Sequence, residues 1–150
     1  MSKGSFKRTK LRLNASELQR ELEDADTALM EAVVAGCAIV AYSDGWVSPE
    51  ETLRMRRLIL RFEPAKALGL AEILRLFEET TLSFADNYEA GEQAAFELVA
   101  RLTGRRRESE LLIDTCCGIA DADGGFDAEE RETILKLCAM LEIEPEAHGL

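Results

Sequence analysis

The 150-residue sequence has few basic residues, few aromatic residues and a single histidine. It contains 18 Lys and Arg against 29 Asp and Glu, which gives a formal net charge of −11. Nucleic-acid binding depends on basic side chains that neutralise phosphates, so this charge argues against a nucleic-acid partner. The same charge disfavours direct capture of a small anion. It favours cations or a basic partner.

A long apolar run is also missing. The most apolar stretch, positions 28–42, is interrupted by Glu31 and is shorter than the roughly 20 apolar residues that a bilayer-spanning helix needs. No apolar segment follows the basic start of the chain, which argues against a secretory signal. We therefore expect a cytoplasmic protein that is not transmembrane.

The four cysteines lack the Cys-x-x-Cys spacing of common metal and redox motifs. Cys37, Cys116 and Cys138 lie within apolar runs. We expect buried free thiols, which suits a reducing compartment. The adjacent Cys116 and Cys117 are not expected to act as a redox pair, because neighbours on a helix point about 100° apart.

The residues that are abundant predict an all-α fold. Hydrophobic residues make up 47% of the chain, Leu, Ala and Glu are frequent, and apolar–polar alternation is absent. Apolar residues recur every three or four positions between capping and turn residues. The predicted helices cover about 14–43, in one piece or with a break near 24–26, then 48–63, 68–84, 88–102, 108–122 and 128–141, with a short turn from Pro145.

The basic residues are concentrated at the start of the chain. Residues 1–12 contain five Lys or Arg and no acid, so their formal charge is +5 and that of the rest of the chain is −16. We expect residues 1–13 to form a basic, disordered N-terminal arm ahead of a single helical domain at 14–150. Peripheral contact of this arm with anionic lipid or with an acidic partner is the alternative.

Three expectations concern the environment of individual side chains. His148 lies two residues from the end of the chain and should be an exposed tail residue. Leu53 and Leu82 should face inward on their helices. The basic run at 105–107 should form a solvated loop or cap the end of the preceding helix.

The chain contains an internal repeat. Residues 37–62 align without gaps with residues 116–141. Four of the seven identical pairs fall in one acidic pattern, Asp-Gly-x-[Val/Phe]-[Ser/Asp]-x-Glu-Glu, at 44–51 and 123–130. Each copy lies between two predicted helices. Repeated helix–turn–helix halves tend to pack about a pseudo-twofold axis, which would bring the two acidic turns together.

The acidic turns have two interpretations. In the first, Asp-Gly forms the turn, and Ser48 and Asp127 cap the helices that follow. Glu51 and Glu130 then complete capping boxes. In the second, carboxylates from both turns bind a divalent cation, because hard cations prefer oxygen ligands. An ordinary EF-hand is not expected, since its first ligand position would be Ile119.

The candidate metal ligands in the two acidic turns fall into first and second choices. The first choices are two carboxylates from each turn, namely Asp44, Glu51, Asp123 and Glu130. The second choices are Glu50, Asp121, Asp127 and Glu129.

The same motifs resemble the TerB tellurite-resistance family. The resemblance covers residues 28–150 and is carried by the segments 32–38, 43–45 and 48–51, the second acidic turn, and the closing His-Gly-Leu. It implies an all-helical domain of about seven helices built from two pseudo-symmetric halves. It also implies a metal site at six carboxylates, namely Asp44, Glu50, Glu51, Asp123, Glu129 and Glu130.

The resemblance further implies a role in bacterial tellurite resistance and stress response, alongside membrane-associated Ter partners at the inner membrane. Because tellurite is an oxyanion and the domain is acidic, we expect an indirect role through metal sensing or partner assembly. The expected cofactor is a divalent cation, with Ca²⁺, Mg²⁺ or Mn²⁺ favoured over Zn²⁺. The alternative is a metal-free acidic module that docks a basic segment of a membrane-associated partner. The sequence has no catalytic motif that would indicate an enzyme.

Overall fold

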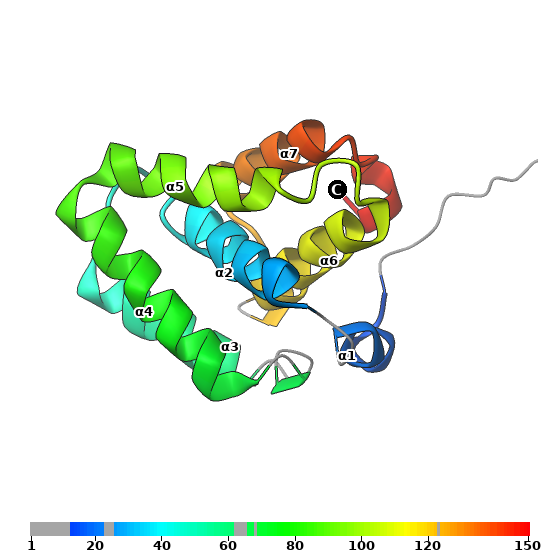
Figure 1. Cartoon of the computed structure of the whole chain (residues 1–150), viewed down its shortest axis with the longest axis horizontal. Coiled ribbons are helices and arrows are strands. Elements are labelled where there is room, and N and C mark those ends of the chain that lie inside the picture. Colours follow the sequence, from blue (N-terminus) through cyan, green and yellow to red (C-terminus); the bar gives the residue numbers. More distant parts are fainter. Residues whose placement is uncertain (1–12, 23–25, 62–65, 68, 123) are drawn as a thin grey trace, which may run out of the picture.

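The computed structural model describes residues 13–22, 26–61, 66–67, 69–122 and 124–150. Within these ranges every long element is an α-helix (Figure 1), so the predicted all-α fold of about seven helices is confirmed. The elements are α1 (Ala15–Leu22), α2 (Thr27–Ala41), α3 (Pro49–Arg61), α4 (Leu70–Asp86), α5 (Tyr88–Ala100), α6 (Arg106–Ala122), α7 (Ala128–Leu141) and the 3₁₀ turn η2 (Pro145–His148).

Side-chain caps mark the starts of α2, α5 and α7. Asp26 precedes α2, and its Oδ1 accepts a hydrogen bond from the backbone N–H of Leu29 at 2.8 Å. Asn87 separates α4 from α5 and accepts from the backbone N–H of Ala90 at 3.1 Å. The first predicted helix is therefore two helices, although part of the predicted break lies outside the described residues. Caps of this kind satisfy backbone donors that have no partner within the helix.

α2 lies at the centre of the molecule. Residues 32–41 are all buried, and the helix packs against α4, α5, α6 and α7 (Figure 1). After Glu31 the helix contains no charged side chain, so no face of it is suited to water. These four helices therefore form a shell around α2.

α4 and α5 form an antiparallel hairpin against α2 (Figure 1). Their backbones lie close together at Gly91, where an added Cβ would lie 2.7 Å from the Cα of Phe84. Only glycine fits such a contact without a backbone shift. The hairpin buries Phe77, Phe84 and Val99 in the common core.

Two leucines expected to face inward are instead exposed. Leu53 is 52% exposed and Leu82 is 65% exposed. Each lies two positions before a buried residue, Met55 on α3 and Phe84 on α4. Two positions correspond to about 200° around a helix, so these leucines point away from the core. The expectation was wrong because the apolar residues of both helices are not confined to one face.

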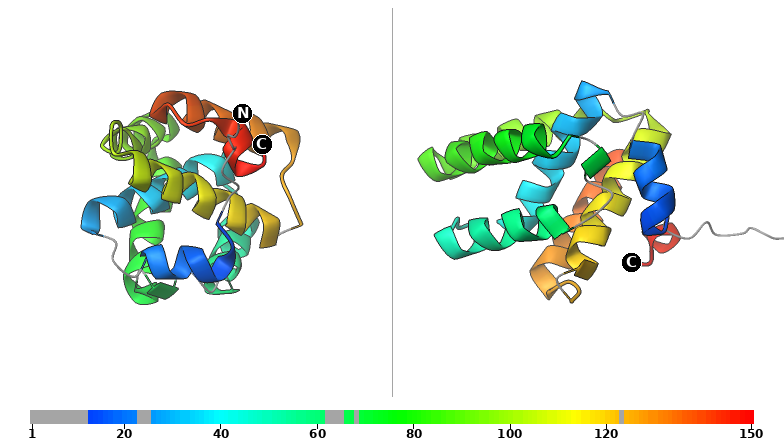
Figure 2. Two further views of the ribbon diagram at one scale, coloured as in Figure 1. Left: turned by 90° about the vertical axis from the view of Figure 1, so that its right-hand side faces the viewer. Right: turned by 90° about the horizontal axis from the view of Figure 1, so that it is seen from below.

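Both ends of the described chain are attached to α6 (Figure 2). The Nδ1 atom of His148 lies 2.5 Å from Oδ1 of Asp114, and their side chains are only 2% and 1% exposed. The backbone N–H of Leu13 donates to Oδ2 of the same aspartate at 3.4 Å. The expectation of an exposed His148 was wrong, because η2 folds the last residues back onto α6. Residues 1–12 of the predicted arm lie outside the described part of the chain.

The cysteines follow the sequence prediction. All four are free and buried.

The longest helices, α4 and α6, have 17 residues each. Over the ranges that the structure describes, no helix combines the length and apolarity needed to cross a membrane.

Replacement of Asp114 by Ala should lower the free energy of unfolding by about 3 kcal/mol, because it leaves the buried His148 ring without its partner. Urea denaturation of the full chain measures this change. Asp86→Ala is the control, since Asp86 is exposed on α4 and its replacement should cost about 0.5 kcal/mol or less. The cost of Asp114→Ala combined with His148→Ala should be clearly below the sum of the single costs. Strict additivity would contradict the pairing.

Candidate functional site at the two acidic turns

The first acidic turn is held by Tyr42, the residue that follows α2. Its hydroxyl lies 3.1 Å from the hydroxyls of Thr52 on α3 and Thr81 on α4. Its carbonyl accepts a hydrogen bond from the hydroxyl of Tyr88 on α5. Its buried ring packs against Phe84 with 5.4 Å between ring centroids. Four helices therefore fix the position at which this turn begins.

The two acidic turns close with matching backbone hydrogen bonds. The N–H of Gly45 donates to the carbonyl of Tyr42 at 2.9 Å, and that of Gly124 donates to Asp121 at 3.0 Å. These pairs occupy equivalent positions in the two copies of the repeat. Both glycines have positive φ values, 85° and 95°, which side chains with a Cβ rarely adopt. The two turns thus share one backbone hydrogen bond and a glycine of positive φ at equivalent positions, while the twofold relation of the halves stays a prediction.

Capping accounts for part of the second turn, as predicted. The carboxylate of Asp127 accepts from the backbone N–H of Glu130 at 2.7 Å. The carboxylate of Glu130 accepts in return from the backbone N–H of Asp127 at 3.1 Å, which completes the capping box. In the first turn, the carbonyl of Ser48 accepts from the backbone N–H of Thr52 at 3.1 Å. The side chain of Glu51 lies outside the described residues.

The structure describes the side chains of four of the six predicted metal ligands. Three of them are exposed: Asp44, Glu50 and Glu129. The fourth, Glu130, is half-buried. Asp123 and the side chain of Glu51 lie outside the described part. In the part of the chain that is described, no three or more His, Cys, Asp or Glu side chains form a group that could hold a metal.

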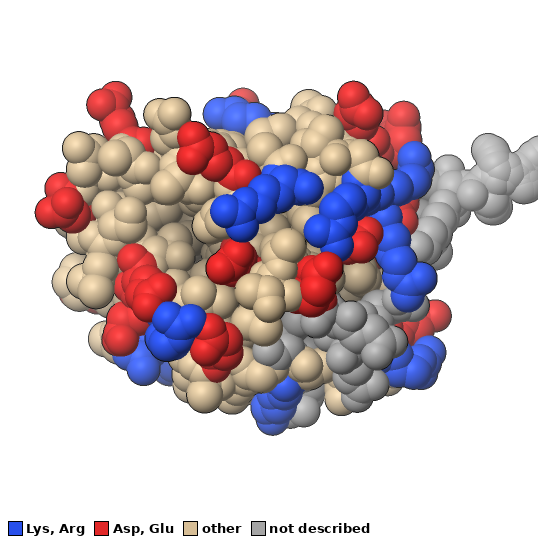
Figure 3. Space-filling view, in the orientation of Figure 1, with Lys and Arg blue, Asp and Glu red and all other residues tan. Residues whose placement is uncertain are grey.

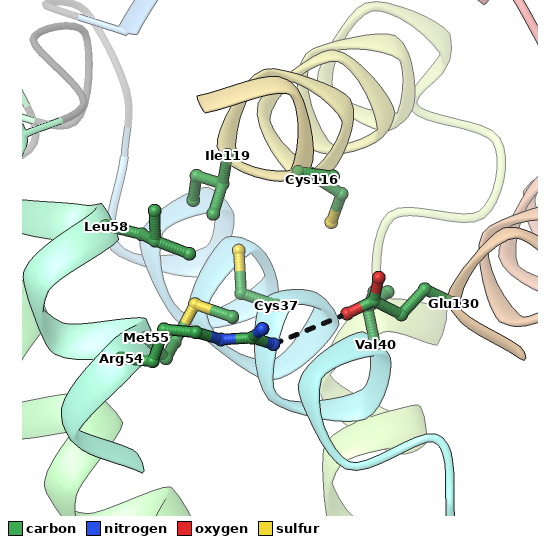
Figure 4. A pocket seen from close by; sticks show the side chains of 9 residues that line it. Cys37, Val40, Arg54, Met55, Leu58, Cys116, Ile119 and Glu130 are labelled. Carbon is green, nitrogen blue, oxygen red and sulfur yellow. Dashed lines mark ion pairs between the residues drawn. The ribbon is translucent and has the colours of Figure 1, made fainter. Parts of the chain in front are cut away.

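An ion pair joins the second acidic turn to α3. Oε2 of Glu130 at the start of α7 lies 3.9 Å from Nη2 of Arg54 (Figure 4). Arg54 belongs to the first copy of the repeat and Glu130 to the second. The acidic start of α7 therefore faces the helix that follows the first acidic turn. A cation bound at Glu130 would compete with the Arg54 guanidinium for the same carboxylate.

A small pocket lies between the two copies of the repeat (Figure 4). Its volume, about 20 Å³, is enough for about one water molecule. Its lining comes from α2, α3, α6 and α7, and consists of Cys37, Val40, Arg54, Met55, Leu58, Cys116, Ile119, Ala120 and Glu130.

Sequence reasoning missed this pocket because cysteines in apolar runs are typical of a closed core. The internal repeat nevertheless contained a signal that could have located the pocket. Cys37 and Cys116 are the first identical pair of the repeat, and Val40 and Ile119 occupy equivalent positions as well. If the repeat copies pack on one another, equivalent residues are expected to meet.

The basic run at 105–107 is not the expected loop, because Arg106 and Arg107 are the first residues of α6, and Arg105 forms ion pairs. Nη2 of Arg105 lies 2.8 Å from Asp26, the cap of α2, and 3.0 Å from Glu108. The hydrogen bond from Arg105 holds the pKa of Glu108 below its usual value, and the pKa of Asp26 is lowered by the N–H of Leu29 and then by Arg105. Figure 3 shows basic and acidic side chains mixed over this region. The run therefore ties the α5–α6 connection to α2.

Comparison with protein families gives a match over most of the chain. A family model described as Tellurite resistance protein TerB matches residues 30–149. No curated protein and no solved structure matches the chain. The matched region includes both acidic turns, the pocket and η2.

Replacement of Asp127 by Ala should lower the free energy of unfolding by about 1 kcal/mol, because it removes the side-chain cap of α7. Arg54→Ala should cost less, about 0.5 kcal/mol, because its ion pair is partly exposed and 3.9 Å long. Urea denaturation of both variants measures the difference. A larger cost for Arg54→Ala would show that the ion pair, and not the cap, holds the second turn.

Proposed function

The chain belongs to the TerB tellurite-resistance family, and we propose that it acts there by binding a divalent cation between its two acidic turns. The proposal rests on the ion pair between Arg54 and Glu130, because this contact brings the acidic start of α7 against α3. α3 itself begins at the first acidic turn. Carboxylates on facing elements create a negative field that a cation neutralises.

The chemistry of the candidate ligands favours a hard cation. The side chains at the two turns supply carboxylate oxygens, which suit Ca²⁺, Mg²⁺ and Mn²⁺ better than Zn²⁺. Glu130 already neutralises Arg54, so cation binding there would release the arginine. The released guanidinium would become available to an anionic partner. This exchange gives cation binding a means of changing the surface of the protein.

An indirect role in resistance is consistent with the charge. Tellurite is an oxyanion, and a chain with a net charge of −11 repels it. We therefore propose that the protein senses a cation or assembles with a partner, and does not sequester tellurite at its acidic turns. A membrane-associated Ter protein is the proposed partner, which would place the chain in the cytoplasm at the inner membrane.

Calorimetric titration of the full chain should give saturable heat with at least one of Ca²⁺, Mg²⁺ and Mn²⁺, and a weaker response to Zn²⁺. Asp44→Ala and Asp123→Ala should each weaken binding by about tenfold, since each removes one charged ligand. Arg54→Ala should strengthen binding, because it removes the competing cation from Glu130.

Glu97→Ala is the matched control for this titration, since Glu97 is an exposed carboxylate on α5. Its affinity should equal that of the unaltered chain. The absence of saturable heat with every ion would eliminate the cation site. If Glu97→Ala and Asp44→Ala weakened cation binding equally, the loss would reflect the general surface charge and not a specific site.

The exposure of the described carboxylates favours a second function. Asp44, Glu50 and Glu129 lie open to solvent, where they could meet a basic segment of a partner. We propose as the alternative that the turns dock such a segment from a membrane-associated protein without a metal. Attraction of this kind is screened by salt.

Pull-down from a membrane fraction should then succeed at low ionic strength and fail at about 0.5 M salt, where the Debye length is only a few ångströms. Glu50→Lys and Glu129→Lys should each abolish capture at low salt, while Glu97→Lys should not. Capture that is unaffected by salt would argue against electrostatic docking. Capture that requires added divalent cation would favour the first function.

A further inference from the structure

Three sulfur-containing side chains line the pocket between the repeat copies. They come from three helices, Cys37 from α2, Met55 from α3 and Cys116 from α6. In Figure 4 the side chain of Cys37 lies between the other two. Cys37 and Cys116 belong to different copies of the repeat and are distant in the chain, so only the packing of α2 on α6 brings them together.

The two thiols are direct neighbours. A hydrogen bond with Cys37, together with burial, raises the pKa of Cys116 well above its usual range. A Cβ added at Gly36 would lie 3.5 Å from Sγ of Cys116, so this thiol packs against the backbone of α2. Cys116 therefore carries its proton at neutral pH, and both cysteines face the same small space.

The pocket reaches the surface at Arg54. This arginine lines the pocket, and its side chain is 44% exposed. Cys117 and Cys138 differ from Cys37 and Cys116, because both have no solvent exposure and neither lines the pocket. Burial raises the pKa of Cys138 to about 12. The chain thus contains one buried thiol pair that lines the pocket, with exposures of 4% and 3%, and two thiols outside the pocket with no exposure.

The donor set selects a class of ligand. Thiol and thioether sulfur atoms are soft donors, which suit soft monovalent ions such as Cu(I). A structural Zn²⁺ site needs four ligands, typically Cys and His, and the pocket lining contains two cysteines and no histidine. The volume of about 20 Å³ admits one ion without a hydration shell.

We propose that Cys37 and Cys116, assisted by Met55, bind one soft monovalent cation of the Cu(I) and Ag(I) class. Two S–H bonds break, two thiolate–metal bonds form, and the two protons pass to solvent. The Met55 thioether donates a lone pair as a third, neutral ligand. No electron is transferred. The resulting bis-thiolate carries one net negative charge beside the guanidinium of Arg54. The site uses sulfur where the proposed divalent site uses carboxylate oxygen, so the two proposals stand independently.

Anaerobic titration of the full chain with Cu(I), in competition with a coloured Cu(I) chelator, tests this site. One equivalent should be withdrawn from the chelator, with release of about two protons per ion in weakly buffered solution. Cys37→Ser and Cys116→Ser should each abolish this competition. Met55→Leu should weaken binding by about tenfold, since it removes one soft donor while keeping the side-chain volume.

Cys138→Ser and Cys117→Ser are the matched controls and should retain one-equivalent binding. Circular dichroism establishes that each variant is folded. In the unaltered chain, bound Ag(I) should also protect Cys37 and Cys116 from alkylation while Cys138 reacts at its usual rate, as mapped by peptide mass spectrometry. This second measurement needs no variant, so a folding defect cannot hide the result.

Failure to compete with the chelator, or equal loss of binding in Cys37→Ser and Cys138→Ser, would overturn the proposal. Uptake of several equivalents that persists in Cys37→Ser would show general thiol capture and would also overturn it. Calorimetry with Ca²⁺ on Cys37→Ser should match that of the unaltered chain. The outcome for the sulfur site is therefore separate from the outcome for the carboxylate site.

Discussion

Burial of residues 32–41 of α2 on every face is the constraint on which the rest of the structure depends. From residue 32 to residue 41 the helix has no face suited to water, so it is stable only when other helices surround it. α4, α5, α6 and α7 supply that shell. The elements that matter for function are then positioned from α2, since Tyr42 at its end holds the first acidic turn and Cys37 on its surface meets α6.

α6 is the second organising element, and its buried polar residues have defined partners. The hydroxyl of Ser109 donates to the carbonyl of Leu102 at 2.8 Å, and that of Thr115 donates to Leu111 at 2.7 Å. Asp114 contacts the backbone of Leu13 as well as His148. Buried polar groups of this kind cost free energy unless they are paired, so the burial of Asp114 depends on its contacts with Leu13 and His148.

The two proposed sites differ in chemistry although they are close in space. Carboxylate oxygens lie at the surface of the acidic turns, and sulfur atoms lie in the pocket beside them. The ion pair of Arg54 with Glu130 belongs to both regions, because both residues line the pocket and Glu130 also completes the capping box of α7. Hard and soft cations would therefore be separated by donor type and by depth below the surface.

The helices and both turns were predictable, because capping residues, Pro49 and the Asp-Gly pairs act on neighbouring backbone and need no distant partner. α7 covers the predicted residues 128–141, and its capping box forms as expected. The orientation of Leu53 and Leu82, the burial of His148 and the meeting of Cys37 with Cys116 were not predictable. Each depends on which helix packs against which, and His148 and Cys37 find their partners on α6, far from them in the chain. Local sequence thus determined the elements and their ends, and only tertiary packing decided which side chains share a site.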